Sequence, residues 1–188
     1  MLSTWMKLGV LAIWAGCTAS PRFSGESEPR FEDYPTKETF QGPPAQPVLV
    51  TAEERQYRTR IRNGVATGEG VWNESQGHSA KATGPNFAGH YYVIRWGCGS
   101  NCLMVAVVDG RTGKVYGPPL HASESELVAS MDPMSEVQIE FRPDSSLMVL
   151  RNGCRWPRSE CGVYYFSWSD NKWSLLKRVL VDLAKDPP

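Results

Sequence analysis

Four cysteines in two closely spaced pairs are the residues of this chain best suited to chemistry. Cys98 and Cys102 form one pair, and Cys154 and Cys161 form the other. Cysteines at such spacing can be oxidised to disulfides, hold a metal ion or supply a nucleophilic thiolate. The fifth cysteine, Cys17, stands apart at the end of an apolar N-terminal run.

The even number of cysteines that follow this run favours oxidation. An apolar leader followed by an even, closely spaced set is typical of a disulfide-bonded extracytoplasmic protein. Three pairings of the four cysteines are possible, and the spacing favours the local ones, 98–102 and 154–161. By chain-entropy reasoning a bridge across so short a loop contributes only about 2 kcal/mol. We therefore expect both bridges to hold a loop in shape rather than to hold the fold together.

Metal binding and cysteine catalysis fit the sequence less well. His78, His90 and His121 do not fall at ligand spacing, and no CxxC motif occurs. The residues after Cys98 read as a strand, so the helix that would lower the pKa of a catalytic thiol is missing. Nucleotide-binding and hydrolase fingerprints are also absent from the sequence. We expect no metal and no cofactor; an enzyme with a site near Asn86, His90 and the arginines remains an alternative.

The loop between the second pair of cysteines carries residue types that often anchor interfaces. We select Arg155, Trp156 and Arg158 as candidate binding residues, because a disulfide-closed loop stiffened by Pro157 loses little entropy on binding. The alternative is an ordinary hairpin loop in which Trp156 folds back onto the sheet.

The N-terminus reads as an export segment. Lys7 precedes the short apolar stretch 8–14, which is far shorter than the roughly 20 residues that span a bilayer. The end of this segment resembles a lipobox, in which Cys17 is acylated, although Trp14 occupies a place that is usually aliphatic. Cleavage after Ala19 and an uncleaved segment are the alternatives. We expect an extracytoplasmic protein, in the periplasm or outer membrane as a lipoprotein, or otherwise secreted.

Charge narrows the class of partner. The chain has 20 basic and 20 acidic residues, and Lys7 is the one charged residue before Cys17, so removing the leader leaves a net charge of about −1. A nucleic-acid binder needs a basic excess to neutralise phosphates. We expect no nucleic acid, membrane contact through the lipid anchor, and an envelope protein or glycan as partner. An envelope hydrolase that the protein inhibits is one such partner.

The mature chain is expected to form a Pro-rich tether (18–47) and one β-rich domain (48–188), and the second half of the tether has enough apolar residues to lie along the domain. Thr51 and Glu54 form a capping-box pattern, which predicts a helix over 52–63 that ends near Gly64. Its other face carries an exposed basic stripe. The polar stretch 66–85 is expected to be a long loop.

From Phe87 onward the pattern predicts β structure. The expected strands are 91–96, 103–108, 114–116, 137–141, 147–150, 163–168 and a return strand from 173, with a short helix at 124–130. We therefore expect a mainly β fold with one N-terminal helix: a single-domain antiparallel meander, as a curved sheet or small barrel.

Four segments resemble an uncharacterised family of small exported bacterial proteins with an NFAGHY…WGCGxxC pattern. They are 57–62, 85–91, 96–102 and 109–116. The resemblance covers about 31–173, implies an exported single domain and carries no activity. Our interpretation is a non-catalytic, disulfide-bonded binding module, and a structural envelope lipoprotein is a further alternative.

Overall fold

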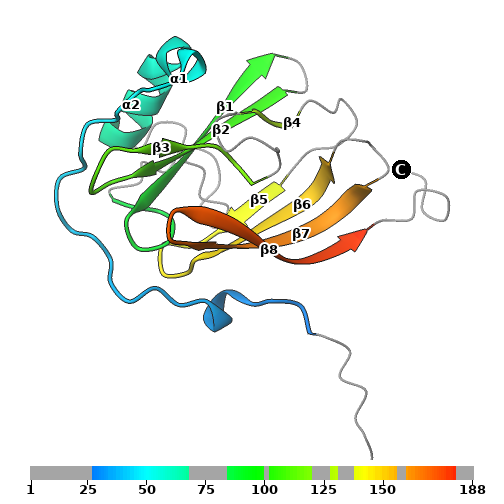
Figure 1. The fold of residues 1–188 in the computed structure, drawn as a ribbon. Coiled ribbons are helices and arrows are strands. Elements are labelled where there is room, and N and C mark those ends of the chain that lie inside the picture. Colours follow the sequence, from blue (N-terminus) through cyan, green and yellow to red (C-terminus); the bar gives the residue numbers. More distant parts are fainter. Residues whose placement is uncertain are drawn as a thin grey trace, which may run out of the picture.

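Two antiparallel sheets make up most of the described chain (Figure 1). The computed structural model describes residues 27–67, 84–99, 102–119, 128–130, 138–155 and 160–180. The first sheet contains β1 (Tyr91–Gly99), β2 (Cys102–Asp109), β3 (Val115–Tyr116) and β4 (Val128–Ser130). The second contains, in spatial order, β5 (Gln138–Phe141), β6 (Leu147–Arg155), β7 (Glu160–Ser169) and β8 (Lys172–Leu180). The predicted mainly β, antiparallel fold is confirmed, with two sheets and no closed barrel among the described strands.

Two short helices, α1 (Ala52–Gln56) and α2 (Arg58–Thr67), precede the first sheet. The predicted capping box is confirmed, because the Glu54 backbone N–H donates to Thr51 Oγ1 and the Glu54 carboxylate accepts from the Thr51 N–H. The single helix predicted to end near Gly64 is wrong, since α2 continues beyond that glycine. No helix in the described ranges has the length and hydropathy needed to span a membrane.

Gly64 explains why the helix does not end where the sequence suggests. It lies on the buried side of α2, and a Cβ atom there would come within 2.5–2.8 Å of three carbons of Ile94 in β1. The glycine therefore allows the helix to pack closely on the strand and does not act as a C-terminal cap. Sequence periodicity carries no information on that tertiary contact.

The short helix expected at 124–130 is wrong for the residues that the structure describes there. Val128–Ser130 form β4, which pairs with β2 at Met104 and Leu103. The short strand β3 covers only Val107 and Val108 of β2, so β4 supplies partners for the backbone farther along the same edge. The chain after Trp173, which fits a helical period as well as a strand, is a strand through Leu180.

Alternation along the strands divides the buried residues among three clusters. Between the sheets lies the main cluster, which includes Val93, Val105, Leu150, Tyr164 and Trp168. The opposite face of the first sheet packs against α2, and the opposite face of the second sheet packs against the N-terminal segment. Neighbouring residues of one strand therefore belong to different clusters, because successive side chains of a strand point to opposite faces of the sheet.

The N-terminal segment from Phe31 to Val50, here called the strap, runs below the second sheet and then up past β3 to α1 (Figure 1). Its backbone bonds to several turns: Thr36 N donates to Asp144 O, Phe40 N to Gly89 O and Val48 N to Gly113 O. This part of the segment expected to be a tether therefore packs against the domain.

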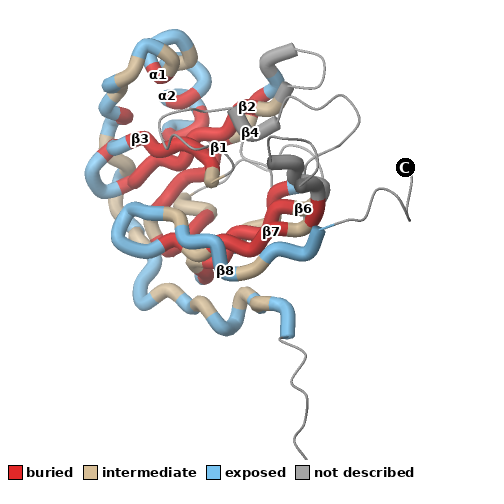
Figure 2. Tube along the Cα trace, turned by 45° about the vertical axis from the view of Figure 1, so that its right-hand side comes forward, coloured by how far each residue is buried: buried red, intermediate tan, exposed pale blue. Residues whose placement is uncertain are grey.

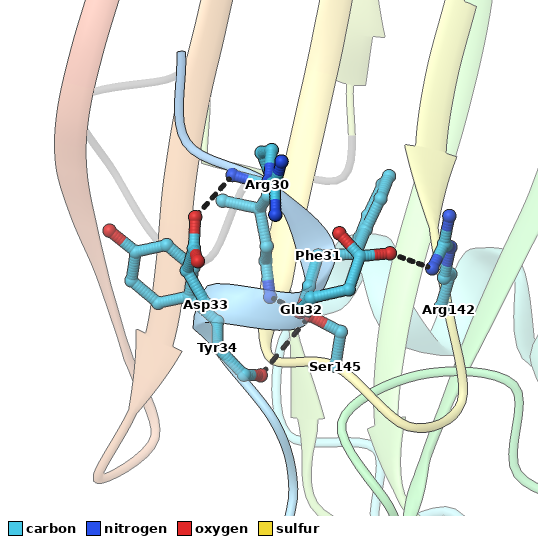
Figure 3. Close-up of polar contacts among 8 residues, drawn as sticks. Arg30, Phe31, Glu32, Asp33, Tyr34, Arg142 and Ser145 are labelled. Carbon is cyan, nitrogen blue, oxygen red and sulfur yellow. Dashed lines mark hydrogen bonds and ion pairs between the residues drawn. The ribbon is translucent and has the colours of Figure 1, made fainter. Parts of the chain in front are cut away.

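Ser145 anchors the beginning of the strap (Figure 3). Its side chain is buried, lies 2.9 Å from Phe31 O and 3.1 Å from Tyr34 O, and accepts from the Leu147 N–H. An exposed ion pair between Arg142 and Glu32 flanks these bonds. The single-turn 3-10 helix Phe31–Asp33 is thereby held against the turn between β5 and β6.

Candidate functional site

The region around Asn86 and His90, the alternative site for an enzyme, is built from backbone-supporting contacts. The Asn86 side-chain amide donates to Val93 O (3.1 Å) and accepts from the Val93 N–H (2.7 Å). This amide therefore forms hydrogen bonds with both the N–H and the C=O group of Val93 in β1. Ala88 and Gly89 have positive φ values of 44° and 78°, which turn the chain into β1.

His90 lies beside a carboxylate that is already used by a turn. Its Nε2 atom is 3.8 Å from Asp109 Oδ1, beyond hydrogen-bond distance. The Asp109 carboxylate accepts from Arg111 N and from Thr112 Oγ1, both at 2.8 Å. Burial lowers the pKa of His90, Asp109 opposes that change, and Arg111 adds to it. Burial therefore favours the neutral imidazole, next to a carboxylate whose bonds shape the β2–β3 turn.

Strand geometry separates His90 from the nearest predicted disulfide. His90 immediately precedes β1, and Cys98 is the penultimate residue of that strand. At about 3.3 Å per residue, eight residues of extended chain place their backbones roughly 25 Å apart. This distance excludes His90 as the general base for Cys98, because proton transfer needs hydrogen-bond contact.

The cysteines lie at the ends of the two long hairpins. Cys154 in β6 and Cys161 in β7 are direct partners in the antiparallel register. At the other hairpin Cys102 pairs with Gly99, and the register shifts between Gly97 and Gly99, on either side of Cys98. The backbone thus brings together both pairs that the sequence analysis favoured. Their side chains lie outside the described residues, so the disulfides stay a prediction.

The candidate binding residues fall, in the sequence, between Cys154 of β6 and Cys161 of β7. Arg155 ends β6, where its partner in register is Glu160 of β7. Trp156 and Arg158 lie outside the described residues, as does the candidate lipidation residue Cys17. The choice between a binding loop and a tryptophan packed on the sheet therefore stays open.

Sequence reasoning missed an apolar surface on β8. Four large aliphatic side chains of this strand are 39–44% exposed: Leu175, Leu176, Val179 and Leu180. Figure 2 colours most of β8 as exposed, whereas β6 and β7 beside it are largely buried. The signal in the sequence was a run of aliphatic and basic residues in 172–180, which fits a helix and a strand equally well.

The exposed residues of β8 lie next to the base of the cysteine-bearing hairpin. Leu180 pairs with Gly162, and Val179 pairs with Val163. A Cβ atom at Gly162 would lie 2.1 Å from Val179 O, so the glycine permits the close approach of β8. The end of β8 therefore lies at the end of the second sheet where Cys154 and Cys161 pair, and the segment that carries Trp156 follows Arg155 in the sequence. We call this end the hairpin–edge surface.

Among the residues that the structure describes, the other charged groups give no comparable site. Arg55, Arg58 and Arg62, the basic stripe predicted on the helix, are exposed. Arg55 donates to Val50 O and Arg58 donates to Arg55 O, so two of the three are engaged with neighbouring backbone. Within the described ranges, no three His, Cys, Asp or Glu side chains gather closely enough to hold a metal ion.

Comparison with known proteins adds no family to these observations. The chain matches no protein-family model, no curated protein and no solved structure. The function is therefore argued from the hairpin–edge surface alone.

Proposed function

We propose that this protein is a non-catalytic binding module of the bacterial cell envelope. Its contact surface is the hairpin–edge surface, to which we assign Arg155, Trp156 and Arg158, selected from the sequence, together with the exposed aliphatic residues of β8. The observation that supports this proposal is the pairing of Leu180 with Gly162, which brings the exposed strand next to the cysteine-bearing end of β7.

The energetics of exposed apolar groups support a partner. A tryptophan can bury about 150–250 Å², and the aliphatic residues of β8 add further area that remains in contact with water. Arginine and tryptophan are the residue types that most often dominate binding energy. An edge strand also presents backbone N–H and C=O groups, which favours a polypeptide over a glycan.

Capture from an envelope extract tests the proposal, with the intact protein as bait. Trp156→Ala should lose the captured partner while thermal stability changes little, because the residue is expected to contact the partner and not the core. Val50→Ala is the control, since Val50 is 69% exposed and lies on the strap. If Trp156→Ala protein unfolds readily and captures the same partner at low temperature, Trp156 is a core residue and the proposal is wrong.

The proposed location rests on the export segment and has its own test. Acylation at Cys17 would place the domain in the envelope, with residues 18–30 between the lipid and the strap. Wild-type protein should incorporate a fatty-acid probe, and Cys17→Ser protein should not. Equal labelling of the two proteins would contradict the lipid anchor.

Oxidation of the cysteines is tested by peptide mapping without reduction. The expected bridges are 98–102 and 154–161, and the register of β6 and β7 supports the second. A free thiol at Cys98 would contradict the binding-module interpretation and favour an enzyme.

A further inference from the structure

We propose that β8 (Lys172–Leu180) binds an extended, acidic segment of the partner protein as an additional strand at the edge of the second sheet. This inference rests on the proposed function, because it names the chemistry of the partner for the same surface. It concerns β8 alone and does not depend on the residues at the hairpin tip.

The position of β8 in the sheet supports strand addition. The order of the second sheet is β5-β6-β7-β8, so within the described chain β8 pairs with β7 alone. It is nine residues long, whereas β5 at the opposite edge has four. In the first sheet, the Asn86 side chain already occupies the backbone of β1 at Val93. Long open edges readily accept an added strand through main-chain hydrogen bonds.

The exposed side chains lie on both faces of this edge. Antiparallel partners point to the same face of a sheet, so Leu175 lies on the core-facing side with its partner Phe166. Val179 lies on the other side with Val163. The side chains of Leu175 and Val179 are both more than 40% exposed, although Phe166 is buried. An added strand with alternate apolar residues can cover the aliphatic side chains on one of these two faces.

Charge selects an acidic segment over a second copy of this chain. The strand carries Lys172, Lys177 and Arg178 and has no acidic residue. Two copies of β8 paired with each other would place like charges along one seam, and like charges on facing strands are destabilising. The same cations would attract glutamate or aspartate side chains of a neighbouring strand.

Three synthetic peptides separate charge from strand pairing. The probe is a blocked, fluorescein-labelled nine-residue peptide in which Val and Glu alternate. One control peptide replaces Glu with Lys, and another keeps the acidic sequence but carries N-methylated valines. Fluorescence anisotropy with the intact protein should show at least tenfold weaker binding of both controls. Equal binding of the Lys peptide would overturn the role of charge, and equal binding of the methylated peptide would overturn strand addition.

Two protein variants with equal change in charge locate the site. The double variant Lys177→Glu/Arg178→Glu should weaken binding of the acidic peptide at least tenfold. The control Arg60→Glu/Arg62→Glu alters exposed residues of α2 by the same charge and should change affinity less than twofold. If both double variants weaken binding equally, the attraction is a property of net charge and the site on β8 is refuted.

A third variant covers the case in which the charge reversal disturbs folding. Leu180 is the last residue of β8 and is 43% exposed. Leu180→Gln should therefore fold normally and bind the peptide several times more weakly, whereas Val50→Gln should bind as the wild type does. Unchanged affinity of Leu180→Gln, or a concentration-dependent dimer that Leu180→Gln dissolves, would refute the inference. Such a result would leave the outcome of Trp156→Ala capture intact, so the two proposals fail separately.

Discussion

Gly64→Ala sets helix propensity against packing at one position, and the structure predicts which effect is larger. Alanine in a helix interior is favoured over glycine by about 1 kcal/mol. The added Cβ would lie 2.5, 2.7 and 2.8 Å from Cγ2, Cγ1 and Cδ1 of Ile94. Ile94 is 1% exposed and packs in the cluster between α2 and the first sheet, so it has little room to move.

Overpacking of this kind costs about 1–3 kcal/mol. With the cost near 2 kcal/mol, subtracting the propensity gain leaves Gly64→Ala less stable by about 1 kcal/mol. In an Ile94→Ala background the three close carbons are absent, so the same change should be neutral or stabilising. The two substitutions should therefore show a coupling energy of about 2 kcal/mol in a double-mutant cycle.

Urea unfolding followed by circular dichroism measures all four proteins of this cycle, provided that the m value stays constant. Two results together would refute the reasoning. The first is a single variant Gly64→Ala that is more stable than wild type by about 1 kcal/mol. The second is a coupling energy that lies within the usual error of additivity, about 0.5 kcal/mol.

Four further predictions concern the strap and the titrating groups. Ser145→Ala removes the hydroxyl that accepts from the buried Leu147 N–H and bonds to the strap, and it should lower the free energy of unfolding by about 1–3 kcal/mol in urea titrations. Gly89→Ala should lower the free energy of unfolding by more than about 1 kcal/mol, because φ is +78° and the new Cβ would lie 2.3 Å from the carbonyl oxygen of Glu38 in the strap. Gly84→Ala is the control and should change stability little, because a Cβ there would meet no atom within 4 Å. Burial lowers the pKa of His90 below 6.5, so the unfolded chain binds a proton at a higher pH than the folded chain does. The free energy of unfolding should therefore fall as the pH drops below about 6.5, and His90→Gln should remove this part of the pH dependence. Burial raises the pKa of Tyr165 to about 12 and also raises the pKa of Tyr91 and of Tyr92, so ultraviolet titration should show phenols ionising above 10, and Tyr165→Phe should remove the one that ionises near 12.

Local signals predicted much of the fold. The capping box at Thr51 and Glu54 formed as expected, because both partners lie within one helical turn. The turn at 109–113 formed as well, since the Asp109 side chain bonds to backbone and hydroxyl groups two and three residues away. Each of these signals involves neighbours in sequence, which is why the sequence was sufficient to predict them.

Long-range contacts decided what the sequence could not. In the sequence Gly64 indicates a helix end, whereas in the structure it allows close packing on Ile94. Val128–Ser130 were predicted to be helical, whereas in the structure they form a strand that pairs with β2. The candidate site also has one part that local sequence signals predicted and one part that only the structure revealed. The sequence selected the loop around Trp156, because residue type and cysteine spacing are local properties.

The exposed edge of β8 was visible only in the structure. The aliphatic and basic residues of 172–180 are compatible with helix or strand, and with burial or exposure. Their role as an open edge depends on β7 being their one partner in the described chain, a pairing that involves residues such as Gly162 and Leu180 far apart in sequence. The sequence by itself therefore determined a β-rich chain with two cysteine-bearing hairpins, whereas the export segment stays a prediction. Tertiary structure determined which strand ends the sheet, because sheet order arises from backbone hydrogen bonds between distant segments that no local pattern records.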